Sequence, residues 1–67
     1  MKYFISRITG NPVEIIGCSD LSIRYVNLTN GIESQVLKES FYTSFYAANI
    51  IEILDIENLI KNAVVSK

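Results

Sequence analysis

The sequence contains no histidine and no tryptophan, and Cys18 is its only cysteine. A Ser-His or Cys-His catalytic pair is therefore excluded, and so is a disulfide bond within the chain. A zinc site is not expected either, because such sites are built mainly from cysteine and histidine. Neither of the phosphate-binding motifs G-x-G-x-x-G and G-x-x-x-x-G-K occurs. We expect no enzymatic activity and no cofactor, and we expect Cys18 to be a small buried apolar residue.

Charge of either sign is sparse. The 67 residues include seven Asp and Glu and six Lys and Arg, which gives a formal net charge of −1. Nucleic-acid-binding domains usually carry a basic face, so nucleic acid is not the partner we expect. No apolar run approaches the roughly 18 residues of a membrane span, and no signal peptide is expected. With its lone cysteine, the chain is predicted to be cytoplasmic and to make no membrane contact.

Apolar residues, by contrast, make up 49% of the chain. We expect residues 1–67 to form a single domain, and a domain of this size buries only about 60% of its unfolded surface. Some apolar surface should therefore remain exposed. Small domains without disulfides or metals are often stabilised by a partner chain. The composition predicts another protein as a partner, and open sheet edges would also favour a homo-oligomer such as a homodimer.

The first half of the chain has the composition and alternation of β-strands. Strands are predicted at residues 2–8, 13–18, 21–28 and 32–37. The segment 9–12 (TGNP) is a predicted turn, and Gly17 inside the second strand indicates a bulge or a close backbone approach.

The sequence Asn30-Gly31 predicts a two-residue hairpin loop of type I′. This loop would place Tyr25 opposite Val36 across the hairpin. The predicted core face of the hairpin then carries four residues: Ile23, Tyr25, Ile32 and Val36.

The second half changes to helical spacing. Phe41 and Phe45 lie four residues apart, with Leu37 and Ala48 on the same stripe. This spacing predicts a helix, or one or two helical turns, within residues 38–49, with both rings packed under the sheet. Residues 50–54 fit a strand or a helix, and this choice stays open. Asp55 is the predicted N-cap of a helix over residues 56–65. The fold class is thus predicted as α+β: a small antiparallel sheet of four to five strands, open or closed into a barrel, with a C-terminal helix.

Two sets of surface residues are candidates for function. Tyr42 and Tyr46 are offset from the phenylalanine stripe, and exposed tyrosines often anchor protein interfaces, so we predict that these two and Tyr3 contact a protein partner. The alternative is a single-strand nucleic-acid surface in which aromatic rings alternate with cations. Its candidate residues are Arg7, Arg24 and Tyr25, although regular alternation directs the last two to opposite faces.

The stretch 23–31 (IRYVNLTNG), followed by 36–39 (VLKE) and by Phe41, resembles small SH3-like β-barrel accessory proteins of phages and bacteria. The resemblance covers about residues 1–45, and the segment 47–67 departs from a bare barrel. It implies a binding module without enzymatic activity and identifies no binding residue. We therefore expect a phage or mobile-element accessory protein that binds and modulates or inhibits a host protein. The alternatives are a small β-barrel that binds single-stranded nucleic acid and a homo-oligomeric structural subunit.

Overall fold

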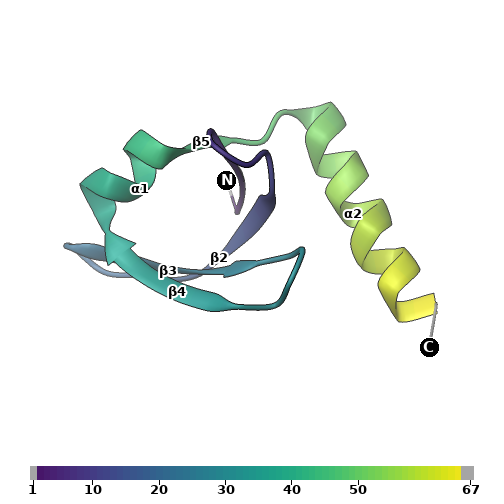
Figure 1. Cartoon of the computed structure of the whole chain (residues 1–67), viewed down its shortest axis with the longest axis horizontal. Coiled ribbons are helices and arrows are strands. Elements are labelled where there is room, and N and C mark those ends of the chain that lie inside the picture. Colours follow the sequence, from purple (N-terminus) through teal and green to yellow (C-terminus); the bar gives the residue numbers. More distant parts are fainter. Residues whose placement is uncertain (1, 66–67) are drawn as a thin grey trace.

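The computed structural model describes residues 2–65, in which five antiparallel strands and two helices follow one another along the chain. In chain order these are β1 (Tyr3–Ser6), β2 (Pro12–Cys18), β3 (Ser22–Asn27), β4 (Glu33–Leu37), α1 (Lys38–Ser44), β5 (Phe45–Ala47) and α2 (Ile50–Val65). The sheet order is β4-β3-β2-β1-β5 (Figure 1). The predicted α+β class with a C-terminal helix is confirmed, and the sheet is open, with β4 and β5 at its two edges.

The hairpin between β3 and β4 differs from the predicted one. Tyr25 lies opposite Ser34, and Val36 lies opposite Ile23. The chain reverses over residues 28–31, because the N–H of Gly31 donates to Asn27 O and the N–H of Asn27 donates to Ile32 O. Gly31 takes φ 77°, but no residue other than glycine has positive φ in the described part, so a type I′ turn is not formed. The register moves by two residues, and each side chain therefore keeps its predicted face.

The β2–β3 pair contains the irregularity that glycine indicated. The register shifts between Ile15 and Gly17, so Ile16 is the extra residue of a bulge. A Cβ on Gly17 would meet Arg24 Cβ at 3.6 Å and Arg24 Cδ at 3.9 Å, both ordinary contacts, so the bulge rather than close packing accounts for this position. Beyond the bulge, Cys18 is exposed, and its predicted burial is wrong.

The first core cluster lies between the sheet and α1. Its buried members are Phe4 from β1, Val13 from β2, Ile23 from β3 and Phe41 from α1. Phe41 has no exposed surface and stacks on Phe45 with ring centroids 4.7 Å apart. The predicted packing of Phe41 and Phe45 under the sheet is confirmed.

The second core cluster lies on the other face of β1. Ile5 points away from its neighbour Phe4 because successive side chains alternate along a strand. It packs against Ala48 and against Ile56 of α2, with Tyr3 and Tyr46 at the margin. Both faces of β1 are therefore covered, one by α1 and the other by α2, while α2 extends beyond the body of the sheet (Figure 1).

The helical turns predicted within residues 38–49 form α1, which covers only the first part of that range. It stops at Ser44, and residues 45–47 instead form β5, which pairs with β1 through Ile5 opposite Tyr46. Edge pairing satisfies the backbone of this segment and brings the chain back to the sheet, which local helical spacing does not reveal.

The open choice at residues 50–54 is settled as helix, since α2 begins at Ile50. Its N-cap is Asn49, whose Oδ1 accepts the N–H of Glu52 at 2.8 Å, while Glu52 Oε1 accepts the N–H of Asn49 at 3.0 Å. This reciprocal pair is a capping box. The prediction that Asp55 caps the helix is wrong, because Asp55 lies inside α2.

Candidate protein-binding surface

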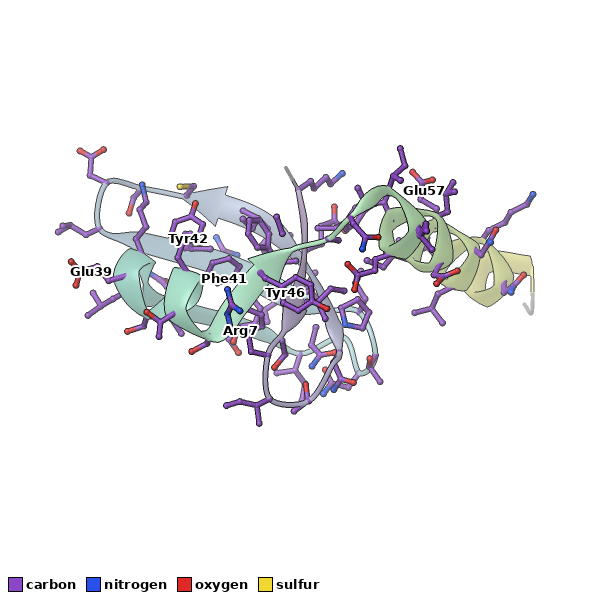
Figure 2. The ribbon with its side chains drawn as sticks, turned by 90° about the horizontal axis from the view of Figure 1, so that it is seen from above. Arg7, Glu39, Phe41, Tyr42, Tyr46 and Glu57 are labelled. Atoms are coloured by element: carbon purple, nitrogen blue, oxygen red, sulfur yellow. The ribbon has the colours of Figure 1, made fainter. Side chains whose placement is uncertain are left out.

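Tyr42 lies beside an apolar recess where three elements meet. α1 directs Phe41 into the core, and the next residue, Tyr42, consequently faces outward (Figure 2). Leu21, which precedes β3, and Leu37, which ends β4, lie on the same recess of about 480 Å³. We call this hollow, together with Leu21, Leu37 and Tyr42, the Tyr42 recess.

The apolar residues of the Tyr42 recess are unusually exposed for their size. The exposed fraction is 76% for Leu21, 65% for Leu37 and 51% for Tyr42. The Tyr42 ring is nevertheless held in place, with its centroid 6.0 Å from that of Phe4 and 5.6 Å from that of Phe41. A ring fixed at one edge and exposed at the other loses little conformational entropy when it binds a partner.

Charged side chains surround the Tyr42 recess. Asp20, Lys38 and Glu39 complete its lining. An apolar centre with a polar rim is the arrangement typical of protein interfaces. The two carboxylates and one ammonium leave this rim without a strong charge of one sign.

Tyr46 has a different setting from Tyr42. Its hydroxyl donates a hydrogen bond of 2.8 Å to Glu52 Oε2, and the Arg7 guanidinium lies 5.6 Å from its ring centroid. The hydrogen bond to the Glu52 carboxylate, together with burial, raises the pKa of Tyr46. Because Glu52 also caps α2, Tyr46 connects β5 to the start of that helix (Figure 2).

Tyr3 lies with Tyr46 rather than with Tyr42. Both pack against the second core cluster, and the Lys2 ammonium lies 5.8 Å from the Tyr3 ring centroid. The structure therefore does not gather the three tyrosines into one surface. Of the three, Tyr42 is the one classed as exposed.

The alternative nucleic-acid residues are also separated. Tyr25 faces the first core cluster, with its ring centroid 5.5 Å from Phe41. Arg24, its neighbour on β3, is exposed and forms an ion pair of 3.2 Å with Glu33. Arg7 follows β1 and covers Tyr46. These three residues do not form a common aromatic and cationic platform.

The sequence interpretation assigned two residues of the Tyr42 recess to the core. Regular alternation over the predicted strand 21–28 puts Leu21 on the face of Ile23 and Tyr25, and helical spacing puts Leu37 on the stripe of Phe41. Leu21 instead precedes the strand, and Leu37 shares the outward face of β4 with Glu33 and Gln35. The alternation of 33–37 (ESQVL) is the signal that places Leu37 outside. Ile32, also predicted in the core, is 61% exposed because it lies before β4 begins.

Comparisons with known proteins add no assignment: no protein-family model, no curated protein and no solved structure matches this chain. Within residues 2–65, no three Asp, Glu, Cys or His side chains are grouped as metal ligands. Neither helix is long and apolar enough, over those residues, to cross a membrane.

Proposed function

We propose that this protein is a small non-enzymatic interaction module that binds another protein at the Tyr42 recess. The observation that carries the proposal is the exposure of Leu21, Leu37 and Tyr42 around one hollow. Contiguous apolar surface with a polar rim marks interaction sites on small proteins. Tyrosine is also enriched among the residues that dominate binding energy.

The resemblance of the sequence to small SH3-like accessory proteins supports a binding role. A strand order β4-β3-β2-β1-β5, with α1 between the two edge strands, is compatible with an SH3-like accessory protein. We place its action in the cytoplasm, where a lone exposed thiol such as Cys18 stays reduced. The partner in this proposal is a host protein whose activity is modulated or inhibited by binding.

The test is capture of a partner from a bacterial lysate by the tagged protein, with and without nuclease, followed by mass spectrometry. The proposal expects one protein to be retained in stoichiometric amount after nuclease treatment. Tyr42→Ala and Leu37→Ala should each abolish or strongly reduce its retention. Ile50→Ala is the matched control, because Ile50 is also an exposed apolar residue but lies on α2, outside the recess.

Three results would count against the proposal. Retention that Tyr42→Ala leaves unchanged would remove the recess from the interface. Retention lost on nuclease treatment would favour nucleic acid, whose binding also weakens steeply between about 50 and 200 mM salt. Recovery of the bait alone would favour a homo-oligomeric structural subunit.

A further inference from the structure

β4 is an unprotected sheet edge. Of the two edge strands, β5 has three residues and directly follows α1, whereas β4 has five residues in regular alternation. Proteins usually protect exposed edges with short strands, prolines, bulges, charged side chains or a covering helix or loop. β4 has no proline and no bulge, its half-buried residues are Ser34 and Val36, and its single charge is Glu33 at its first position.

The backbone of β4 offers a continuous set of hydrogen-bonding groups at this edge. Ile32 O accepts from β3, and Lys38 N donates to Leu21 O, so the alternate residues between them face the other way. The N–H and C=O groups of Glu33 and Gln35 and the N–H of Leu37 therefore point away from β3, whereas Leu37 O, at the N-cap of α1, is also the first acceptor of that helix. The sheet order places no strand beyond β4, so these groups are directed to the open edge.

We propose that β4 pairs antiparallel with β4 of a second copy of the chain, about a two-fold axis through Gln35. This register joins two Gln35 residues as one hydrogen-bonded pair. It also places Glu33 of each copy opposite Leu37 of the other. Each of the three residues whose backbone groups point to the open edge then lies opposite another such residue. Sliding one strand along the other would leave at least one of the three without such a partner.

The side chains of β4 are complementary to themselves in this register. The axis brings together two neutral amides, and Glu33 of each copy, which is already paired with Arg24 of its own chain, lies opposite the uncharged Leu37 of the other. No like charges therefore lie directly opposite one another. A parallel in-register pair would instead set Glu33 against Glu33, which is destabilising, so charge favours the antiparallel orientation.

The same pairing adds an apolar residue to the Tyr42 recess. Ile32 of the second copy lies opposite Lys38, at the end of β4 where Leu37 and Lys38 line the recess. Ile32 is 61% exposed in the single chain and would gain an apolar neighbour there. Each recess would thus be completed by the other copy. This last consequence depends on the proposed function, whereas the strand pairing does not.

The first test is the mass of the purified chain by analytical ultracentrifugation over a range of concentrations, without any other protein. The wild-type chain should reach twice the mass of one chain. Gln35→Lys places two ammonium groups on the axis and should raise the dimer dissociation constant about tenfold or more. Ile16→Lys is the matched control, because Ile16 is an exposed residue of the interior strand β2 and should leave the dimer intact.

The register is tested by cross-linking in a Cys18→Ser background. Cα atoms of a hydrogen-bonded antiparallel pair are about 5.5 Å apart, within the range of a disulfide. Gln35→Cys should therefore form a covalent dimer under mild oxidation, and Ile16→Cys should not. A wild-type monomer at all concentrations, or a dimer unchanged by Gln35→Lys, overturns the proposal. Because both assays use the chain alone, failure to bind another protein does not affect their outcome.

Discussion

Replacement of Phe41 by alanine probes the residue on which the first core cluster depends. The side chain has no exposed surface, and its ring centroid lies 5.0 Å from Phe4, 5.5 Å from Tyr25 and 4.7 Å from Phe45. Truncation of a buried phenylalanine costs about 3–5 kcal/mol, through lost transfer free energy and the cavity left behind. Each aromatic pair adds about 0.5–1.5 kcal/mol beyond burial. We expect a loss in the upper part of this range.

That loss is large relative to the stability of the whole protein. At about 0.05–0.15 kcal/mol per residue, a chain of 67 residues has a free energy of unfolding of about 3–10 kcal/mol. Phe41→Ala should therefore remove between about a third and all of this free energy. Phe41→Leu keeps most of the volume and should cost about 1–3 kcal/mol, which urea denaturation can measure.

The neighbouring residue provides the control. Tyr42 lies on the same helix but is half exposed, so Tyr42→Ala should cost less than Phe41→Ala, about 1–2 kcal/mol through its ring contacts with Phe4 and Phe41. Urea denaturation followed by circular dichroism would compare the variants. A loss below about 1 kcal/mol for Phe41→Ala, or a loss for Tyr42→Ala equal to or greater than that for Phe41→Ala, would refute the assignment of inward and outward faces on α1.

Two further predictions concern the start of α2. The pKa of Tyr46 is raised above its usual 10.0, so the hydrogen bond to Glu52 should stabilise the fold fully below pH 10 and be lost as pH rises through the raised pKa. Phenolate absorbance should show this, and Glu52→Gln should bring the pKa of Tyr46 back toward the usual value. Asn49→Ala should cost about 0.5–2 kcal/mol in thermal denaturation, whereas Asn49→Asp, which retains a cap, should cost less.

The sequence predicted correctly those features of the fold that depend on residues close together in the chain. β-Branched and aromatic alternation predicted the strands, and the i, i+4 spacing of Phe41 and Phe45 predicted that both rings pack under the sheet. Gly17 indicated the bulge. The capping box at Asn49 and Glu52 was also present in the sequence as N-x-x-E, a pattern that would have predicted the start of α2. Asp55 was chosen instead because residues 50–54 are apolar and fit either type of element.

The residues of the candidate site were harder to predict from the sequence than the elements of the fold. Tyr42 was identified because its position is offset from the phenylalanine stripe, and the structure places it at an exposed recess. Leu21 and Leu37 were assigned to the core because hydrophobicity alone does not distinguish a buried leucine from an exposed one. Tyr3 and Tyr46 pack at the margin of the second core cluster, which exists only because α2 packs on β1.

The sequence by itself determined the absence of histidine chemistry, the α+β class and the inward direction of Phe41, because composition and periodicity act over a few residues. Tertiary structure alone decided the hairpin register, the use of residues 45–47 as an edge strand and the packing of α2 on β1. Each of these depends on hydrogen bonds and contacts between residues distant in the chain, such as Ile5 with Tyr46. The same long-range pairing leaves β4 open, and that edge is the basis of the proposed dimer.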